Sequence, residues 1–555
     1  MSRAQMSDLW WKNAVIYCLD IETFYDSNGD GWGDLTGLIE RIEYLADLGV
    51  TCLWLMPFYP SPGRDDGYDI ADFYGVDTSL GTLGDFVVLI RTAKDRGLRV
   101  IIDLVVNHTS DRHPWFRQAR ASRSSPFRDY YVWRDEPPPG PSPNIVFPDA
   151  EDSIWSWDER AGQWYLHHFY AHQPDLNYAN PVVRAEIDKI AGFWMELGVD
   201  GFRIDAVPFL VEEGAQDVGL DPHELLKDLR SFISRRNGGA VLLGEVNLPP
   251  RPLIKFFGGH PGDQLHMLFN FPVMQRMYLA LAREDARPLA RQLKLLPKIP
   301  PECQWANFVR NHDELTLDQL TENQQGEVAD VFGPDEDMQL FGRGLRRRLP
   351  PMLDGNPERM RMTYSLLLSL PGTPVLFYGE EIGMGENLSV PGRLSVRTPM
   401  QWSSDRNGGF SSAPPSRLRR QPPSGRFGPM GVNVADQERD PDSMLIWMER
   451  MIRRRRETPE LGWGALTVCD TDENAVLAHR CDWEGRSVLV VHNFSSSPTT
   501  TRVDLGRLPA DYRLDDLLSP GLSDVRQRRN RLEIDLQGFD HRWFRIEATD
   551  QPRRP

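Results

Sequence analysis

Short apolar runs that alternate with stretches of helical spacing constrain the fold of this chain more than any other feature. Continuous apolar runs are typical of strands buried on both faces, as in a parallel sheet covered by helices. Helical periodicity is clearest at residues 35–48 and 85–96. Strands alternating with helices through most of the chain favour a closed (β/α)8 barrel, also called a TIM barrel, within the α/β class. The eight expected strands are residues 14–17, 50–56, 100–106, 201–205, 241–245, 266–269, 306–311 and 375–378.

Two interruptions and one change of pattern divide this expected barrel. Its first part covers residues 1–107, and residues 108–178, rich in aromatic residues and Pro, predict a domain inserted after the third strand. The second part covers residues 179–462 and includes a charged, partly helical excursion after the seventh strand at residues 314–358. Beyond it, short alternating runs predict a C-terminal antiparallel β-sandwich over residues 463–555.

The composition favours an enzyme of a small neutral substrate. The 555 residues carry a formal net charge of −17, and an acidic surface repels nucleic acids and anionic membranes, so neither is expected as a partner. We find no apolar run of membrane-spanning length and no signal peptide at the start. The five cysteines are widely spaced without a CxxC motif, which predicts reduced, buried thiols and a cytoplasmic protein.

Carboxylates stand at the ends of three expected strands. Asp205 ends the fourth, Glu245 ends the fifth and Asp313 follows the seventh. Side chains at the C-terminal ends of barrel strands line the active site of such a fold. A single Asp at a strand end is usually a helix N-cap, but caps do not explain three such carboxylates with Arg203 two residues before one of them.

A pair of carboxyl groups is the requirement for breaking a glycosidic bond. One must be ionised to attack the anomeric carbon, and the other must be protonated to release the leaving oxygen. The two-residue period of a strand places Arg203 and Asp205 on one face, so the guanidinium should keep Asp205 ionised. Glu245 follows an apolar strand, where burial should raise its pKa.

Several segments together resemble the ordered motifs of the α-amylase superfamily, glycoside hydrolase family 13. Residues 103–108, 201–205, Glu245 and 311–313 are similar to its four main motifs, in the family's order. Residues 173–177 resemble its fifth motif and fall in the expected inserted domain. The resemblance covers nearly the whole chain and implies a retaining enzyme that acts on short α-glucosides through a glucosyl-enzyme intermediate.

The resemblance also implies the roles of individual residues. Asp205 matches the nucleophile, Glu245 the general acid/base and Asp313 the carboxylate that steadies and distorts the sugar. Asp65 and Tyr68 lie in a segment similar to a sugar-binding loop of the family. Arg397 matches an arginine that grips the non-reducing end together with that Asp, although a surface ion pair is the simpler interpretation. The implied substrate-binding residues are Asp65, Tyr68, His108, Arg203, His312 and Arg397.

Two segments are candidates for structural Ca2+. In residues 26–34, oxygen-bearing side chains recur at every second position with Gly between them, a pattern that suits this hard cation. The segment resembles the calcium loop of α-glucosidases of the family, and the alternative is a loop of Asx turns without metal. The predicted ligands are Asp26, Asn28, Asp30, Trp32 and Asp34.

The second candidate resembles a calcium that ties the inserted domain to the barrel. The alternative is a set of ordinary hydrogen-bonding residues. The predicted ligands are Asn107, Asp175 and Glu212 with the carbonyl groups of Phe209 and Leu210.

Within the family, the sequence is most similar to the trehalose synthases, which interconvert maltose and trehalose. Residues 58–68 and 311–316 carry this likeness, and Ala206 matches enzymes acting on α-1,4 links. Residues 246–250 and 18–23 depart from the pattern of the synthases. Isomerisation requires the released glucose to stay while water is excluded, so these departures leave open an α-1,4-glucosidase or a transglucosylase with another acceptor.

A third alternative belongs to a different class. Some family members are catalytically inactive binding modules that have lost catalytic residues and carry a membrane helix. This chain retains Asp205, Glu245 and Asp313 and has no such helix, so an inactive binding module is only a remote alternative.

Overall fold

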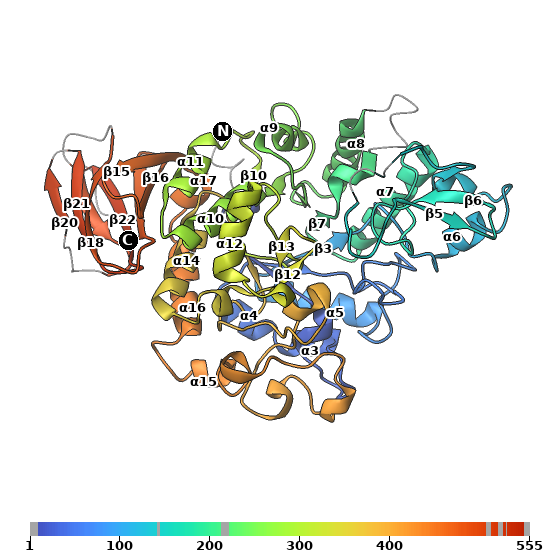
Figure 1. The fold of residues 1–555 in the computed structure, drawn as a ribbon, viewed down its shortest axis with the longest axis horizontal. Coiled ribbons are helices and arrows are strands. Elements are labelled where there is room, and N and C mark those ends of the chain that lie inside the picture. Colours follow the sequence, from blue (N-terminus) through green and yellow to red (C-terminus); the bar gives the residue numbers. More distant parts are fainter. Residues whose placement is uncertain are drawn as a thin grey trace.

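The computed structural model places a barrel between two smaller parts of the chain. In Figure 1 the C-terminal strands lie on one side of the barrel and the inserted segment on the other. The long loop after the last barrel strand, which includes α15 (Val434–Gln437), extends from a third side. The structure describes residues 9–140, 142, 145–211, 221–506, 512–519, 525–528 and 530–548.

Eight parallel strands form a closed barrel, as predicted. The order around the barrel is β1-β14-β10-β9-β8-β7-β3-β2, and neighbouring strands are parallel throughout. Apart from Arg99, every residue of these strands is buried, which explains their continuous apolar runs. The strands are β1 (Ile16–Leu19), β2 (Cys52–Leu55), β3 (Arg99–Leu104), β7 (Gly201–Ile204), β8 (Val241–Gly244), β9 (Met267–Phe269), β10 (Gln304–Phe308) and β14 (Thr373–Phe377).

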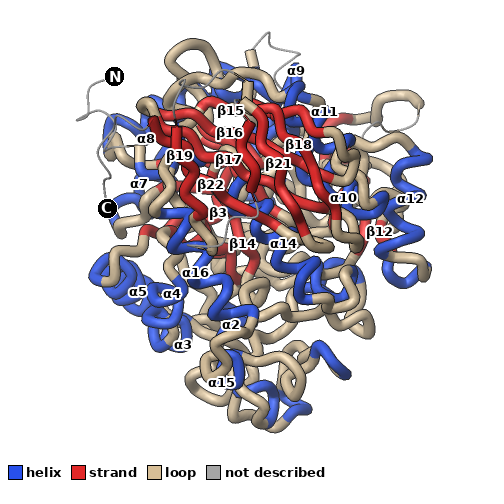
Figure 2. Tube along the Cα trace, turned by 90° about the vertical axis from the view of Figure 1, so that its left-hand side faces the viewer, coloured by secondary structure: helices blue, strands red, loops and turns tan. Residues whose placement is uncertain are grey.

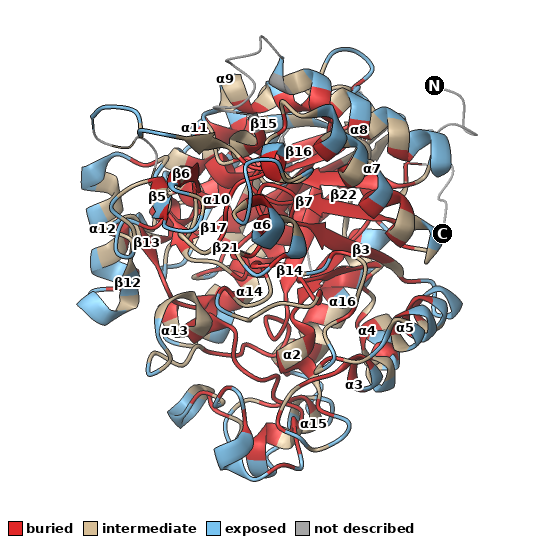
Figure 3. Ribbon diagram, turned by 90° about the vertical axis from the view of Figure 1, so that its right-hand side faces the viewer, coloured by how far each residue is buried: buried red, intermediate tan, exposed pale blue. Residues whose placement is uncertain are grey.

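Helices cover the outside of the barrel and shield its strands from solvent (Figure 3). The helical pattern at residues 35–48 forms two helices, because the chain breaks at Arg41, whose guanidinium lies over the rings of Tyr25 and Trp402. Periodicity alone did not predict this break. The longer helices are α3 (Leu35–Glu40), α4 (Ile42–Leu48), α5 (Leu83–Asp95), α7 (Pro181–Glu196), α8 (Pro222–Arg236), α10 (Phe271–Arg283), α11 (Arg287–Leu295), α14 (Pro357–Ser369) and α16 (Met444–Arg456).

The segment between β3 and β7 has its own small sheet. Its strands β4 (Trp133–Arg134), β6 (Gln163–Leu166) and β5 (Trp155–Asp158) pair antiparallel in that order. Isolated bridges between His108 and Asp175 and between Tyr131 and Leu176 fasten the returning chain beside its exit from β3. The predicted bounds 108–178 enclose these elements.

The excursion after β10 also contains a small sheet. The strands β11 (Leu315–Thr316), β13 (Gly344–Leu345) and β12 (Gln339–Leu340) pair antiparallel. The helix α12 (Glu322–Phe332) lies between β11 and β12 along the chain, and α13 (Leu349–Met352) follows. The excursion therefore has a defined structure at the end of the barrel where β10 terminates.

The C-terminal strands form the predicted sandwich (Figure 2). The strand β15 belongs to both halves, because its first five residues pair with β16 and its last two with β18. Leu489 and Val491 of one half share a buried cluster with Leu532 and Ile534 of the other. The strands are β15 (Ala465–Thr471), β16 (Val476–Trp483), β17 (Arg486–Asn493), β18 (Thr499–Asp504), β19 (Tyr512–Asp516), β20 (Val525–Arg528), β21 (Arg531–Leu536) and β22 (His541–Ala548).

Two further expectations concern the whole chain. All five cysteines are free and buried, as predicted. Among the residues that the structure describes, no helix is both long enough and apolar enough to cross a membrane.

Candidate active site

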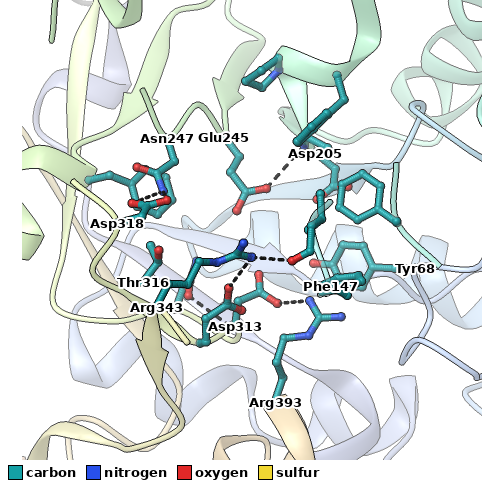
Figure 4. A pocket seen from close by; sticks show the side chains of 18 of the residues that line it. Tyr68, Phe147, Asp205, Glu245, Asn247, Asp313, Thr316, Asp318, Arg343 and Arg393 are labelled. Carbon is teal, nitrogen blue, oxygen red and sulfur yellow. Dashed lines mark hydrogen bonds and ion pairs between the residues drawn. The ribbon is translucent and has the colours of Figure 1, made fainter. Parts of the chain in front are cut away.

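A cavity of about 400 Å³ lies at the C-terminal ends of the barrel strands. Its volume lies in the range of sites for small molecules. Residues from the strand ends form its floor, and residues of the inserted segment and the excursion form its rim (Figure 4). Six predicted site residues line it: Asp65, Tyr68, His108, Asp205, Glu245 and Asp313.

One guanidinium holds the two predicted catalytic carboxyl groups. Arg203 Nη1 lies 2.5 Å from Asp205 Oδ1, and Arg203 Nη2 lies 2.7 Å from Glu245 Oε2. The same Nη1 lies 2.5 Å from Asp103 Oδ1, and Asp103 also accepts a hydrogen bond from the indole of Trp54. Arg203 and Asp103 are direct neighbours across β7 and β3, and the Arg203 side chain is 1% exposed. Asp103 therefore fixes the guanidinium before any substrate binds.

The two carboxyl groups have different pKa values in this environment. Burial raises the pKa of Asp205 to about 6, against the opposing effect of Arg203. Burial raises the pKa of Glu245 to about 8, again opposed by Arg203 and reinforced by the charges of Asp205 and Asp313. Burial thus outweighs the guanidinium that we expected to dominate at Asp205. Between these pKa values, Asp205 is ionised and Glu245 protonated, as a nucleophile and a general acid must be.

The third carboxylate, Asp313, is surrounded by donors. Its Oδ1 lies 2.6 Å from Arg393 Nη1 and 3.0 Å from Arg397 Nη2, and its Oδ2 lies 3.0 Å from His312 Nε2. Burial raises its pKa, but the neighbouring His312 and arginines lower it more, so its pKa lies well below the usual range. The hydroxyl of Tyr68 lies 2.7 Å from His312 Nε2, and the two rings are stacked. Asp313 is therefore ionised and held in one orientation.

Asp65 and Arg397, which the resemblance places together on the non-reducing end of the sugar, have different partners in the structure. Asp65 Oδ1 lies 2.5 Å from Arg393 Nη2, whereas Arg397 Nη1 lies 2.5 Å from Asp66 Oδ2. Arg393 lies in the single turn η7 (Gly392–Val396), and Arg397 directly follows that turn, so both reach the same region at different depths. Arg393 lines the cavity, and Arg397 lies behind it with 1% of its side chain exposed. The motif was recognised correctly, but the arginine facing the cavity lies four residues earlier.

The other predicted binding residues lie at two depths. His108 lines the cavity, and its Nε2 lies 3.2 Å from the carbonyl oxygen of Tyr68. Arg203 and His312 are buried behind the lining and contact the carboxylates in front of them. Burial lowers the pKa of His108 and lowers that of His312 to about 4, so both imidazoles are neutral near pH 7.

The inserted segment and the excursion meet at the rim of the cavity. Arg343 Nη2 donates to the carbonyl oxygen of Val146 at 2.8 Å and lies 3.2 Å from Glu314 Oε1. The rings of Phe147 and Phe341 lie 5.2 Å apart, centre to centre. We call these five residues the rim contact; Figure 4 labels two of them, Arg343 and Phe147. It joins two loops that are far apart in the sequence, and neither Phe147 nor Arg343 has a periodic pattern that could have predicted it.

A second contact joins the end of β8 to the excursion. Asn247 Nδ2 donates to both carboxylate oxygens of Asp318, at 3.0 and 2.9 Å. Asp318 also accepts a hydrogen bond from Gln275. Asn247, Leu248 and Asp318 line the cavity, so one residue that departs from the synthases, Leu248, faces it.

The predicted calcium loop is held by its own hydrogen bonds. Asn28 and Asp30 each accept the backbone N–H two residues further on, which makes Asx turns and leaves lone pairs free. Both oxygens of Asp26 accept two hydrogen bonds each, and Asp34 accepts them from Ser27 and Gly37. Over the described ranges, no group of three or more His, Cys, Asp or Glu residues is placed to hold a metal. The loop fits a cation at its middle positions better than at Asp26.

Two predicted ligands of the second calcium site, Asn107 and Asp175, contact each other. Asp175 pairs with the imidazole of His168 and accepts a hydrogen bond from Asn107 Nδ2 at 3.1 Å. These contacts are those of the hydrogen-bonding alternative, and calcium at this site stays a prediction. Glu212 lies outside the described residues, and the carbonyl-bearing residues lie in the turn η3 (Val207–Val211): Phe209 and Leu210.

The two carboxyl pKa values predict the pH dependence of turnover. The value of kcat/KM for an aryl α-glucoside should be highest between about pH 6 and about 8, because Asp205 must be ionised and Glu245 protonated. E245Q should lose the alkaline limb and keep the acidic one, since an aryl leaving group needs little protonation. An alkaline limb that survives in E245Q would assign it to another group.

Comparisons with known proteins agree with this geometry. The family described as the α-amylase catalytic domain matches residues 19–331 and 347–464, and the C-terminal domain of sucrose hydrolase-like proteins matches residues 485–545. Trehalose synthase from Pimelobacter sp. (strain R48) is 40% identical over 566 residues, which cover 98% of this chain and 97% of that protein.

Two other proteins extend the likeness. The trehalose synthase/amylase of Mycolicibacterium smegmatis is 43% identical over 555 residues, covering 98% of this chain and 93% of that protein. The crystal structure of a trehalulose synthase from Pseudomonas mesoacidophila MX-45 superposes with a TM-score of 0.77 at 27% identity, covering 97% of this chain and 99% of that one. The chain belongs to the α-amylase family, glycoside hydrolase family 13, and is an enzyme of that type.

Proposed function

We propose that this enzyme interconverts maltose and trehalose through a glucosyl-enzyme intermediate on Asp205. The rim contact carries the proposal, because isomerisation requires an acceptor side that retains glucose and excludes water. The likeness to two proteins named as trehalose synthases over 98% of the chain supports it.

In the first half-reaction, the carboxylate of Asp205 attacks the anomeric carbon of the non-reducing glucose of maltose. Glu245 donates its proton to the glycosidic oxygen, and the bond to the second glucose breaks. Arg203 contacts both groups, so it favours the ionised form of Asp205 and stabilises the charge that Glu245 acquires when it gives up its proton. The products are a glucosyl ester on Asp205 and one free glucose.

In the second half-reaction, the free glucose turns so that its anomeric hydroxyl faces the ester. Glu245 takes the proton of that hydroxyl while its oxygen attacks the anomeric carbon and releases Asp205. Two displacements at one carbon retain the α configuration there. When the α-anomer of the free glucose attacks, the product is an α,α-1,1 disaccharide. The reaction consumes no water and needs no other reactant.

The lining suits both sugars. Asp65, Arg393 and Asp313 place charged groups around the position of the glucosyl unit, where they can bind hydroxyl groups. On the rim, Phe147 offers an aromatic face, and Asn247 lies beside Asp318. The amide oxygen of Asn247 is buried and accepts no hydrogen bond among the described residues, so it is open to a hydroxyl of the acceptor glucose.

A second candidate function is hydrolysis or transfer to another acceptor. Leu248 lines the cavity, and Pro249 and Pro250 begin the short helix α9 (Pro250–Leu253), within the segment that departs from the synthases. If this side admits water during the life of the ester, the enzyme is an α-1,4-glucosidase or transglucosylase with the same carboxylates.

The buried free cysteines favour a cytoplasmic location, and the net charge of −17 argues against a nucleic-acid partner.

Incubation with maltose and excess labelled glucose distinguishes the two functions. We expect trehalose that is mostly unlabelled and little additional free glucose, because the same glucose leaves and attacks again without exchange. Trehalose, its label and free glucose are measured over time. Free glucose as the dominant product, with no trehalose at any time, would establish the hydrolase.

Loss of the rim contact should change how the glucosyl ester is divided between isomerisation and hydrolysis. Arg343→Gln removes the charged donor between Val146 and Glu314, so the share of maltose converted to glucose should rise by about threefold or more while maltose consumption changes little. The control is Arg283→Gln, which breaks an exposed pair with Glu327 on the same excursion and should leave the partition unchanged. Equal partition in the two variants would remove the rim contact from this role.

We also propose that a structural Ca2+ binds the loop at residues 26–34, with Asn28 and Asp30 among its ligands. Removal of calcium with a chelator should lower the melting temperature by a few degrees, and added Ca2+ should restore it, because a bound ion stabilises the folded state. D30N should reduce the response. A melting temperature that is indifferent to both treatments would leave a loop held only by its Asx turns.

A further inference from the structure

A buried arginine from the loop after β14 lies behind the catalytic carboxylates. Arg420 belongs to a stretch without helix or strand, yet its side chain is only 4% exposed. It does not line the cavity. None of the roles proposed above uses Arg420. A buried guanidinium has a high desolvation cost, which its partners must offset.

Three successive ion pairs connect Arg420 to the catalytic site. Its Nη2 pairs with Asp66, and Asp66 pairs through its other oxygen with Arg397 Nη1 at 2.5 Å. Arg397 in turn places Nη2 3.0 Å from Asp313 and donates Nε to the carbonyl oxygen of His312 at 2.8 Å. Charges of alternating sign therefore connect the loop to the third catalytic carboxylate.

Arg420 also supports Arg397 directly. Its Nη1 donates to the carbonyl oxygen of Arg397 at 3.0 Å and lies 3.2 Å from Asp20 Oδ2. Burial raises the pKa of Asp66, but Arg420 and Arg397 lower it more, and the net result lies well below the usual range. Asp66 is thus ionised, and it depends on both arginines. Without Arg420, Arg397 would be the one cation paired directly with Asp66 among the described residues, in competition with Asp313, and Arg419 would act on Asp66 only from a greater distance.

We propose that Arg420 is a positioning residue, which holds Asp66 and Arg397 so that Asp313 keeps its orientation toward the sugar. The inference rests on the proposed function only in that Asp313 acts on a bound glucosyl unit. It assigns the loop after β14 a part in catalysis although that loop does not reach the cavity at Arg420. A displacement of a catalytic group by about 1 Å can lower turnover by two orders of magnitude.

The neighbouring arginine provides a matched control. Arg419 lies on the same loop and stacks over Trp32, and its side chain is 34% exposed. It pairs at 2.6 Å with Glu22, which Arg420 also approaches at 3.4 Å. It has no direct contact with Asp66 in the described chain. If the arginines only fasten the loop, substitutions at both positions should have similar effects.

The test uses R420K, R420M and R419M in the full chain, with an aryl α-glucoside as substrate. The value of kcat/KM for release of the aryl group depends only on the steps up to formation of the glucosyl ester, so it is independent of whether the product is trehalose or glucose. An inactive native enzyme would contradict the proposed function, whereas the variants test only Arg420. Kinetic constants and melting temperatures are measured for each.

For R420K we expect kcat to fall by about tenfold with KM nearly unchanged, because one ammonium cannot span Asp20, Asp66 and the carbonyl oxygen of Arg397. R420M should be slower still, and R419M should stay within about twofold of the native enzyme. If R420M does not fold, R420K decides alone. Native kcat in R420K with a lowered melting temperature, or equal losses in R419M and R420K, would make Arg420 a purely structural residue.

Discussion

The guanidinium of Arg203, buried among three carboxylates at the mouth of the barrel, is the interaction on which the site depends. Burial alone would drive Asp103, Asp205 and Glu245 toward the protonated state, and no attack on a sugar could follow. One cation shared among them offsets part of that cost. It does not neutralise all three, so burial still raises the pKa of Asp205 to about 6 and that of Glu245 to about 8. Asp205 and Glu245 thus share one cation in a buried site, and the group with the lower pKa is the one that is ionised as the nucleophile.

Buried arginines and carboxylates also hold one another in place around Asp313. Arginines from the segment after β14 alternate with acids from the loop after β2, and few of these charges are exposed. Buried ion pairs add little net stability, because desolvation offsets their attraction. Their benefit is geometric, since each planar guanidinium binds two or more oxygens in fixed directions. The glucosyl pocket is therefore shaped by charged groups that are already oriented before the sugar arrives.

The barrel strands and the three carboxylates could be predicted from the sequence, because both follow local rules. Continuous apolar runs identify strands buried on both faces, and a parallel barrel gathers their ends at one mouth. Arg393 could not be separated from Arg397 in this way, because an irregular turn gives no rule for which of two arginines faces a cavity. The same holds for loop residues whose partners lie about two hundred residues or more away in the sequence: Arg343, Phe147 and Arg420. Their partners follow from tertiary packing alone.

The acceptor side shows how a local departure in sequence can be compatible with an unchanged reaction. Residues 246–250 differ from the usual synthase pattern, yet Asn247 still joins the end of β8 to Asp318 of the excursion. Exclusion of water depends on whether loops meet over the cavity, and the rim contact achieves this through Arg343 and Phe341 on one side and Val146 and Phe147 on the other. A backbone carbonyl is one of the acceptors, so this contact constrains the path of the inserted segment more than its side chains. Under the proposed function, the partition between isomerisation and hydrolysis therefore follows from how long the two loops stay joined relative to the lifetime of the ester.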